Sequence, residues 1–268
     1  MSLTLSVIIV NYNSGRFLKR ALDSVKGTSA VKYEIIVVDN ASTDESLKLI
    51  ENENVKLIRL NENIGFGPAN NIGLKEARGE FILFLNPDAE LLPESINQML
   101  EIFKEPKAGA TSCILVFPDG KFQPSFGLMD KGIIGEFFDK FIASWFLPVY
   151  LKLKKKPFEV NWLSGAAILT KQEVLEKIGG FDPKFFLYME DVDLCRRIRL
   201  AGYRIILNPN CRVIHHLGKS GGKKDRAFFE SKRSQLTYYK KWKSSFQNWL
   251  IKKYLKLRLG KDFKKLSV

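Results

Sequence analysis

Residues 81–88 read Phe-Ile-Leu-Phe-Leu-Asn-Pro-Asp, which is five apolar residues followed at once by a polar turn. An uninterrupted apolar run of this length predicts a strand that is buried on both faces, as the strands of parallel sheets are. A similar run at residues 5–10 ends at Asn11-Tyr12-Asn13, and another at residues 34–38 ends at Asp39-Asn40. We therefore expect a parallel sheet whose strands each end in a compact polar stretch.

Outward from these strands, the chain alternates between apolar runs and amphipathic stretches. We expect further strands at residues 55–60, 110–117 and 165–169, and helices at residues 45–52, 190–200 and after a capping box at Thr170–Glu173. This alternation is typical of βαβ units, so the fold class is α/β, with a single mainly parallel sheet flanked by helices. Ligands of such sheets bind outside the carboxyl ends of the strands, where the polar stretches lie.

The composition excludes several classes of protein. Of the 268 residues, 45% are hydrophobic and 27% are charged, which is typical of a globular chain and not of a disordered one. The three cysteines are widely spaced without a CxxC pair, which excludes a disulfide-stapled secreted domain or a cysteine-rich zinc module and favours a reducing compartment. The sequence predicts neither a signal peptide nor a transmembrane helix.

The positive charge is concentrated at the C-terminal end. Residues 219–268 hold 16 Lys/Arg and three Asp/Glu, which leaves residues 1–218 nearly neutral although the whole chain carries a formal charge of +14. We therefore divide the chain into a body, residues 1–218, and a basic tail, residues 219–268. Such asymmetry indicates an anionic partner for the tail, either a nucleic acid or a membrane surface.

Two carboxylates follow strands at positions where a ligand is expected. Asp88 is suited to a divalent cation, which prefers oxygen ligands and usually keeps phosphate oxygens in its shell, although Asn-Pro-Asp is also ordinary turn chemistry. Asp39 can accept hydrogen bonds from a base or a ribose, while Ser42 or Thr43 caps the following helix.

Two more clusters lie in the second half of the chain. Glu190, Asp191 and Asp193 open a helix, where the macrodipole favours anions, and the apolar residues 185–188 precede them. A wall of apolar side chains beside a carboxylate removes water from it and raises its pKa, which suits a general base. The two histidines of the chain, His215 and His216, are adjacent in a polar stretch, which makes them candidate ligands.

Together and in this order, these motifs resemble the family 2 glycosyltransferases with the GT-A fold, and most nearly their bacterial rhamnosyltransferase-like group. The resemblance covers about residues 4–220. It runs through eight blocks: Ser6–Asn13, Val38–Asp44, Asn63–Phe66 with Asn71–Gly73, Leu85–Asp88, Trp162–Gly165, Gly179–Asp182, Glu190–Leu194 and His215.

The resemblance implies a role for each matching residue. The catalytic base would be Asp191, and the ligands of Mg²⁺ or Mn²⁺ on the diphosphate would be Asp88 and His215, with His216 as a possible substitute. The nucleotide-binding residues would be Asn11, Asp39, Asn63, Gly65 (which leaves room for the ligand) and Asn71. The acceptor and sugar pocket would be shaped by Trp162, Gly165 and Glu190.

The sequence departs from the family at one point. The metal motif of the fold is most often Asp-x-Asp, and here Asn86 stands at its first position, which removes a charge and predicts weaker metal dependence. Glu90 is near enough in sequence to contribute to the metal site.

The resemblance also implies the type of reaction. A single base without an enzyme nucleophile implies a displacement with inversion, from a UDP- or dTDP-linked sugar to a hydroxyl of a glycan or lipid-linked acceptor in cell-surface polysaccharide synthesis. Two carboxylates on opposite faces of a sugar would instead indicate hydrolysis, but the second carboxylate here is assigned to a metal, which favours transfer.

Two alternatives stand beside this interpretation. The basic tail and its aromatic residues would suit a nucleic-acid-binding protein, but the body is nearly neutral and carries no nucleic-acid motif, so no nucleic-acid partner is expected. An inactive family member that acts as a scaffold is the other alternative. The presence of Asp88, Asp191 and His215 together argues against it.

The tail contains an apolar stripe surrounded by lysines, formed by Trp242, Phe246, Trp249, Leu250, Tyr254 and Leu257. Their spacing predicts one amphipathic helix suited to an anionic membrane surface. The protein is then expected to be cytoplasmic and peripheral on the inner membrane face, with a second apolar contact from Ile133, Ile134, Phe137, Phe138, Phe141, Trp145 and Phe146. Alternatively, the stripe docks on the body and the lysines are simply solvated.

Overall fold

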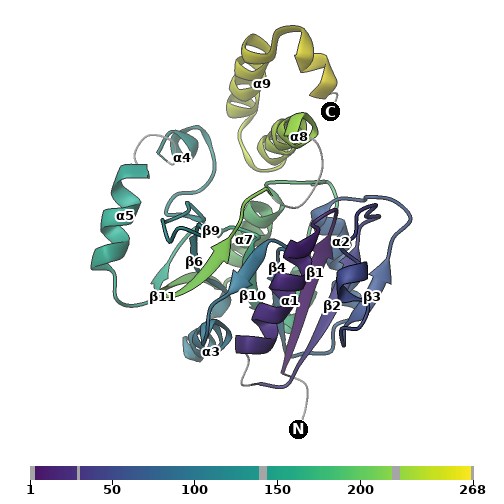
Figure 1. The fold of residues 1–268 in the computed structure, drawn as a ribbon. Helices are drawn as coiled ribbons and strands as arrows, with labels where there is room; N and C mark the ends of the chain where they lie inside the picture. The colour runs from purple at the N-terminus through teal and green to yellow at the C-terminus, as the bar shows by residue number, and fades with distance from the viewer. Residues whose placement is uncertain (1–3, 29–30, 139–143, 219–223, 267–268) are drawn as a thin grey trace.

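The computed structural model describes residues 4–28, 31–138, 144–218 and 224–266. Figure 1 shows a β-sheet flanked by helices, and a hairpin of two C-terminal helices at the end of the molecule opposite the N-terminus. The strands are β1 (Leu5–Asn11), β2 (Tyr33–Asp39), β3 (Lys56–Arg59), β4 (Phe81–Leu85), β5 (Ala89–Leu91), β6 (Ala108–Val116), β7 (Phe126–Gly127), β8 (Phe158–Glu159), β9 (Trp162–Leu163), β10 (Ala167–Lys171) and β11 (Arg204–His215). The α-helices are α1 (Arg16–Thr28), α2 (Phe66–Lys75), α3 (Ser95–Leu100), α4 (Ile133–Phe138), α5 (Ser144–Leu153), α6 (Gln172–Ile178), α7 (Glu190–Leu200), α8 (Lys224–Trp242) and α9 (Ser245–Leu259), and the short 3₁₀ helices are η1 (Lys48–Ile50), η2 (Glu101–Lys104) and η4 (Gly260–Leu266).

The main sheet is mixed and mostly parallel, which confirms the predicted fold class. Its order is β3-β2-β1-β4-β10-β6-β11-β5, with β8 paired to β11. The strands β3, β2, β1 and β4 run parallel, β10 is antiparallel to both β4 and β6, and β11 is parallel to β6. The sheet is not the only one, because β7 and β9 form a separate antiparallel pair.

The core lies on both faces of the main sheet. The alternating side chains of β1 divide between two buried clusters, with Ile8 and Val10 in one and Val7 and Ile9 in the other. Both faces of β4 are covered in the same way, as its unbroken apolar sequence predicts. The sheet is therefore fixed on both sides, and polar groups gather where its parallel strands end.

Two expectations about local structure were wrong. Residues 45–52 form only the short η1. The predicted capping box does not cap a helix, because Thr170 lies in β10 and its hydroxyl donates to the carbonyl of Gly109 at 2.6 Å. The helix α6 begins after Lys171 instead, without a side-chain cap. Thr170 is buried within the sheet, so its hydroxyl bonds to a neighbouring strand and its oxygen does not cap the backbone N–H groups at the start of the helix.

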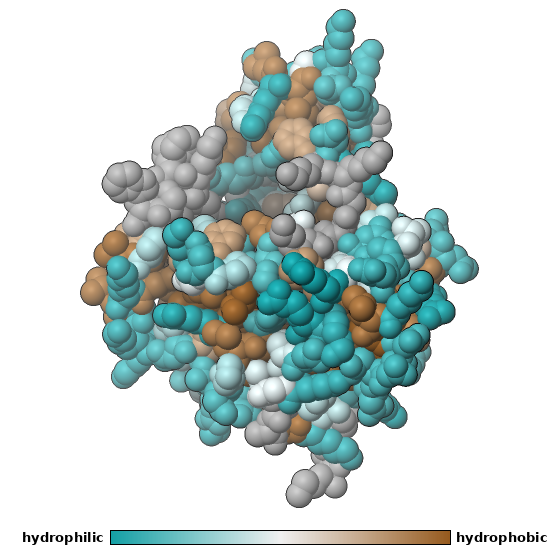
Figure 2. All heavy atoms as spheres, in the orientation of Figure 1, coloured by the Kyte–Doolittle hydropathy of each residue, from teal (hydrophilic) through white to brown (hydrophobic). Residues whose placement is uncertain are grey.

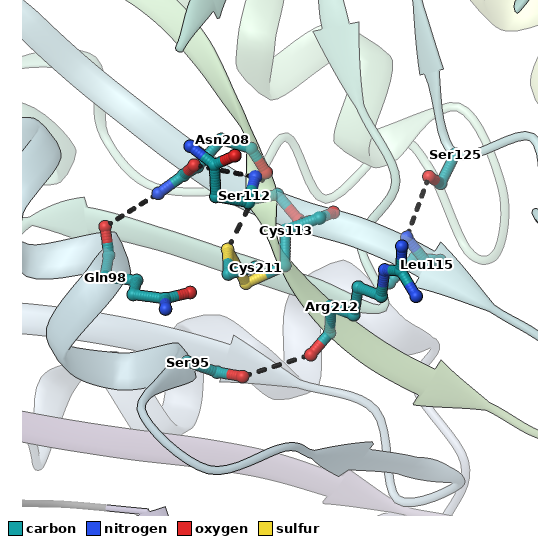
Figure 3. Close-up of a disulfide and its surroundings, with 10 residues drawn as sticks. Ser95, Gln98, Ser112, Cys113, Leu115, Ser125, Asn208, Cys211 and Arg212 are labelled. Atoms are coloured by element: carbon teal, nitrogen blue, oxygen red, sulfur yellow. Dashed lines mark hydrogen bonds between the residues drawn. A yellow bond between two sulfur atoms is a disulfide. The ribbon is translucent and has the colours of Figure 1, made fainter. Parts of the chain in front are cut away.

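The cysteine interpretation also needs correction, because Cys113 and Cys211 form a disulfide. They lie on the neighbouring strands β6 and β11 with their Cα atoms 4.9 Å apart, although 98 residues separate them in the sequence. Figure 3 shows the disulfide beside the irregular register of β11, where the backbone of Arg212 accepts from Ser95 and Asn208 donates to the carbonyl of Gln98. Sequence spacing could not reveal this pair, since only the sheet brings the two strands together.

The basic tail is not one amphipathic helix. The first helix, α8, ends at Trp242, and Ser244 caps the second helix, α9, by accepting a hydrogen bond from the backbone N–H of Gln247. The two helices pack together, and α8 buries Tyr238 and Tyr239 completely against the body. Trp242 therefore does not belong to the predicted stripe; its indole donates to Asp193 Oδ1 at 2.7 Å.

Charged contacts also fasten α8 to the body. Lys241 Nζ lies 2.6 Å from Asp182 Oδ2 and 2.7 Å from Asp193 Oδ1. Lys243 Nζ lies 2.7 Å from Asp130 Oδ2, and these contacts hold the pKa of both Asp130 and Asp182 below the usual range against the opposing effect of burial. The tail thus docks on the body, as the alternative interpretation proposed, but Lys241 and Lys243 take part in this contact and are not simply solvated.

Candidate active site

A pocket opens at the carboxyl ends of β1, β2 and β4, the position predicted for a ligand. We call it the strand-end pocket. It is lined by Val10, Tyr12, Asn40, Asn63, Gly65, Phe66, Asn86, Pro87, Phe186, Leu187, Arg226, Ala227 and Glu230. Of the predicted nucleotide-binding residues, Asn63 and Gly65 belong to this lining. Tyr12 and Asn40, which also line it, lie in the polar stretches that end β1 and β2.

Asn11 and Asp39 form the support beneath the pocket. The parallel register of β1 and β2 places them side by side, and the Asn11 amide donates to Asp39 Oδ1 at 2.8 Å. The same amide nitrogen donates to the hydroxyl of Ser46, and Asp39 Oδ2 accepts from the backbone of Ser42. Both side chains are buried, so these bonds hold the ends of the two strands in place.

Asn40 connects this support to the wall of the pocket through hydrogen bonds. Its amide donates to Asn63 Oδ1 at 2.9 Å and to the carbonyl of Gly65 at 3.2 Å, and its oxygen accepts from the backbone of Ile64. Gly65 has a φ of 98°, and a Cβ there would lie 2.4 Å from the carbonyl oxygen of Phe186. The missing side chain therefore admits the backbone of residue 186.

Asn71 has a different environment from the one expected. Its amide donates to the carbonyl of Phe181, and its oxygen accepts from the backbone of Phe181, each at 2.8 Å. It is not among the residues that line the strand-end pocket. Both ends of the amide are used to fasten α2 to the turn after α6, so Asn71 supports the fold beside the pocket instead of lining its nucleotide side.

Asp88 and His215, the two predicted metal ligands, lie close together. The antiparallel register of β5 and β11 sets Ala89 opposite His215, and the distance from Asp88 Oδ1 to His215 Nε2 is 3.3 Å. Gln123 Oε1 lies 2.8 Å from His215 Nδ1. A glutamine oxygen accepts a hydrogen bond from Nδ1–H, and in this tautomer of a neutral imidazole the lone pair of Nε2 can bind a cation.

His216 does not replace His215. Its Nε2 lies 2.5 Å from Glu90 Oε1, and the Arg20 guanidinium lies 2.8 Å from the same oxygen. Glu90, which its sequence position made a candidate for the metal site, is therefore engaged in a separate ion-pair cluster. The two adjacent histidines serve different clusters, which the doublet in the sequence could not show.

The donor set fits a divalent cation that also binds phosphate. No group of three His, Cys, Asp or Glu side chains suited to a metal occurs in the described part of the chain. Mg²⁺ is commonly held by one or two carboxylates together with substrate phosphates, so one carboxylate and one imidazole are sufficient when a diphosphate completes the shell. Asn86, next to this pair, has its amide nitrogen 3.4 Å from His215 Nε2.

Asp191 is fixed by the backbone on two sides. Its Oδ2 accepts from the backbone of Gly165 and its Oδ1 from the backbone of Val192, each at 2.8 Å. Burial raises the pKa of Asp191 above its usual range, although both hydrogen bonds act in the opposite direction. The carbonyl of Ala166, the residue after Gly165, accepts a hydrogen bond from the backbone N–H of Asn86. The segment 165–166 therefore joins Asp191 to the metal candidates.

Glu190 and Trp162 border the same region. Burial and the neighbouring Asp191 raise the pKa of Glu190 well above its usual range. The ammonium of Lys131 lies 4.3 Å from the ring centre of Trp162, and its charge acts to lower the pKa of Asp191 against the larger effect of burial. In the described residues, neither Glu190 Oε2 nor Trp162 Nε1 has a hydrogen-bond partner. Both atoms are buried, and the Trp162 indole packs against Gly127.

The apolar residues 185–188 do not form one wall beside the carboxylates, because each has different surroundings. Phe185 is buried in the cluster beneath α8, Phe186 and Leu187 line the strand-end pocket, and Tyr188 is largely exposed. Tyr188 and Met189 have positive φ values of 69° and 65°, an uncommon conformation for side chains of this size. Asp193, the remaining carboxylate, anchors Lys241 and Trp242 of the tail.

Sequence reasoning missed Gln123 and the tail residues Arg226 and Glu230. Gln123 lies in a stretch with mixed composition that offered no periodic pattern, and only its position beside His215 indicates its role. Arg226 and Glu230 belong to the basic tail, and no local signal in its sequence indicates that it reaches the pocket.

Known proteins resemble this chain in sequence. The sequence model described as glycosyl transferase family 2 matches residues 6–179. An N-acetylglucosaminyl-diphospho-decaprenol L-rhamnosyltransferase of Mycobacterium tuberculosis is 31% identical over 243 residues, which cover 83% of this chain and 79% of that protein. The rhamnosyltransferase WbbL of Escherichia coli K12 is 29% identical over 224 residues, which cover 78% of this chain and 82% of that protein.

Solved structures share the fold. A mannosyltransferase from Pyrobaculum calidifontis, in complex with GDP-Man and Mn²⁺, matches with a TM-score of 0.66 and 21% identity, over 90% of this chain and 64% of that one. GalNAc-T7, with UDP, GalNAc and Mn²⁺, matches with a TM-score of 0.64 and 21% identity, and the match spans about half of that longer chain. These likenesses concern the GT-A fold.

Proposed function

From the premise that this chain belongs to glycosyl transferase family 2, we propose that it transfers a sugar, with inversion, from a UDP- or dTDP-linked donor to a hydroxyl of a lipid-linked or glycan acceptor in cell-surface polysaccharide synthesis. The observation that carries this proposal is the convergence of the strand-end pocket, the Asp88–His215 pair and the buried Asp191 around the segment 165–166.

The donor is held by two parts of the site. In this proposal, the nucleoside lies in the strand-end pocket beside Tyr12, Asn40 and Asn63, above the buried Asn11–Asp39 support. Asp88 and His215 would hold Mg²⁺ or Mn²⁺, which supplies charge neutralisation for the departing nucleoside diphosphate. Gln123 orients His215 for this task.

Asp191 acts on the acceptor. A hydroxyl becomes an adequate nucleophile when a base takes its proton as it attacks, and the raised pKa of Asp191 makes its carboxylate a stronger base. The backbone of Gly165 and of Val192 fixes its orientation. No second carboxylate is assigned to attack the sugar, so a single displacement inverts the anomeric carbon.

A donor screen tests the proposed function. The full chain is incubated with Mn²⁺ and a panel of UDP-, dTDP- and GDP-linked sugars, and release of nucleoside diphosphate and protection against thermal unfolding are measured. We expect one UDP- or dTDP-linked sugar to be hydrolysed slowly and to raise the melting temperature, because a ligand that binds only the folded state stabilises it. No response to any donor would contradict the proposal.

The acceptor side includes a membrane surface, formed by the exposed face of α9. Ile251 and Leu255 are buried in the tail hairpin, whereas Phe246, Trp249, Tyr254 and Leu257 are exposed. Lys252, Lys253, Lys256 and Arg258 surround them, and Figure 2 shows apolar side chains between projecting polar ones at this end of the molecule. No helix of the described residues is long and apolar enough to cross a bilayer. We propose that this lipid-facing surface binds the cytoplasmic leaflet.

A second contact is offered by α4 and α5. Ile134, Val149 and Leu153 are exposed there, together with Ile133 and Phe146. The sequence also places Phe137, Phe138, Phe141 and Trp145 in this contact. The structure describes only the backbone of Phe137, Phe138 and Trp145, and Phe141 lies outside the described residues. Figure 1 shows α4 and α5 on the side of the body near the tail hairpin.

Substitution of Lys252, Lys253 and Lys256 by alanine should lower membrane binding on the order of 100-fold, because each lysine near an anionic surface contributes about 1 kcal/mol. The measurement is co-sedimentation with phosphatidylcholine vesicles that contain increasing phosphatidylglycerol, at two salt concentrations. The matched control replaces three exposed lysines of the body, Lys48, Lys75 and Lys104, and changes the net charge equally. Equal recovery of the α9 variant and the unmodified protein in the vesicle pellet would refute the surface. Deleting the whole tail is a less suitable test, because it also removes Tyr238 and Tyr239 and uncovers Phe185 and Val192 of the body.

A further inference from the structure

One wall of the strand-end pocket comes from the tail and not from the sheet. Arg226, Ala227 and Glu230, in the first turns of α8, line it opposite the strand ends. The body and the tail are therefore not separate at this point, although the charge distribution divides the chain at residue 218. What these α8 residues contribute can be read from their contacts.

Glu230 has one carboxylate oxygen engaged and one that is not. Its Oε1 lies 2.5 Å from the Arg233 guanidinium, whereas its Oε2 is buried without a hydrogen-bond partner in the described residues. Only 8% of the residue is exposed. Buried polar groups are nearly always hydrogen-bonded, so a bare carboxylate oxygen beside a pocket indicates a ligand that donates a hydrogen bond.

Arg226 is the one cationic side chain among the described residues that line this pocket. Its guanidinium lies 5.1 Å from the ring centre of Phe186, which belongs to the same lining. The lining also includes Asn86 and Pro87, the residues directly before Asp88. A planar guanidinium suits the oxygens of a phosphate group, and here it lies in the pocket that leads to the metal candidates.

The position of α8 is fixed by contacts with the loop that precedes α7. Ser234 donates its hydroxyl to the carbonyl of Leu187 at 2.8 Å, and Leu187 lines the pocket. Further along, Tyr238 and Tyr239 are completely buried, and Lys241 binds Asp182 and Asp193. The helix is thus held against the body from Ser234 to Lys241, directly after the turn that carries Glu230.

We propose that α8 completes the donor site: Arg226 binds a phosphate oxygen of the nucleoside diphosphate, and Glu230 Oε2 accepts a hydrogen bond from a hydroxyl or N–H group of the nucleoside. The proposal rests on the proposed function, since it assigns the strand-end pocket to a nucleotide-sugar. It makes the tail a part of the catalytic unit with two tasks, donor recognition by α8 and membrane contact by α9.

The test is isothermal titration of the full chain with UDP and dTDP and with the nucleosides uridine and thymidine, in Mn²⁺ and in EDTA. Arg226→Ala should weaken nucleoside diphosphate binding by about 10- to 100-fold, the size of a charge-assisted hydrogen bond, and should leave nucleoside binding unchanged. The loss should persist in EDTA, because it does not depend on the metal. Glu230→Ala should weaken the nucleoside and the diphosphate by similar factors.

Two variants serve as controls. Lys240→Ala removes one positive charge from an exposed position of α8 outside the pocket, and we expect unchanged affinities. Arg233→Ala breaks the ion pair with Glu230 but keeps the carboxylate, so it separates ligand binding by Glu230 from support of the helix.

The outcomes distinguish the two proposals. If the unmodified protein binds UDP or dTDP and Arg226→Ala binds it equally well, the α8 assignment is wrong and the proposed function stands. If Arg233→Ala reproduces the full loss of Glu230→Ala, the role of Glu230 is structural and its part of the assignment is overturned. If the unmodified protein binds neither diphosphate, both proposals fall.

Discussion

Asp191→Asn should lower the rate of sugar transfer by about two to four orders of magnitude, which is the usual contribution of a general base. The amide cannot take the proton of the acceptor hydroxyl. The structure adds an expectation about stability: both carboxylate oxygens accept backbone hydrogen bonds, and an amide group must leave one of them unmade, at a cost of about 1–3 kcal/mol. Transfer should therefore be measured well below the melting temperature of the variant, together with donor affinity, which should not change.

Glu190→Gln is the matched control for this experiment. Glu190 is the neighbouring carboxylate, and its pKa is also raised by burial, so it is the competing candidate for the base. We expect a much smaller loss of transfer in this variant than in Asp191→Asn. A larger loss would transfer the assignment to Glu190, and near-normal transfer by Asp191→Asn would remove Asp191 from the mechanism.

The pH dependence follows from the direction of the Asp191 shift. A base acts in its deprotonated form, so the transfer rate should fall as the pH is lowered through the pKa of this group. Because burial raises that pKa, the fall should begin at a higher pH than for an exposed aspartate. In Asp191→Asn, the residual rate should lose this acid limb.

Asp88→Ala should weaken binding of UDP or dTDP in the presence of Mn²⁺ by about 10- to 100-fold or more, since even the loss of a supporting partner of a metal ligand typically costs that much. Removing the carboxylate leaves His215 Nε2 as the remaining protein ligand in the proposed site. Titrations with and without the metal measure the effect, and the difference between them should shrink in the variant.

Glu90→Ala serves as the control for the Asp88 experiment. Glu90 lies two residues away, but it binds Arg20 and His216 and not the Asp88–His215 pair. We expect its removal to leave metal-dependent binding unchanged. Excess EDTA should reduce transfer by the unmodified protein as Asp88→Ala does, and full activity in EDTA would refute the metal site.

Much of the fold could be predicted from the sequence, because its signals are local. The apolar runs of β1, β2 and β4 and the polar residues after them are contiguous in the chain, and parallel strands place such residues at one edge of the sheet. The same rule brought Asp88 within the candidate site. The motif Glu190-Asp191 could be found because helix start signals are also local.

Other features depend on contacts between distant residues. Nothing near Cys113 in the sequence indicates Cys211, and only the pairing of β6 with β11 joins them. The difference between His215 and His216 arises from β5, which pairs beside β11 and presents Asp88 to one ring and Glu90 to the other. Asn71 carries a family motif, yet both of its polar atoms bind Phe181, 110 residues away.

The sequence by itself determined which chemical groups this protein has available: the strand-end amides, the carboxylates at positions 88 and 191, and a tail with concentrated positive charge. The tertiary structure decided which of these groups meet. It divided the tail into α8, which buries two tyrosines and lines the pocket with Arg226 and Glu230, and α9, which keeps an apolar face exposed. The physical reason is that burial depends on the surfaces of both partners, whereas periodicity describes only one of them, so an amphipathic pattern predicts a helix without specifying what covers it.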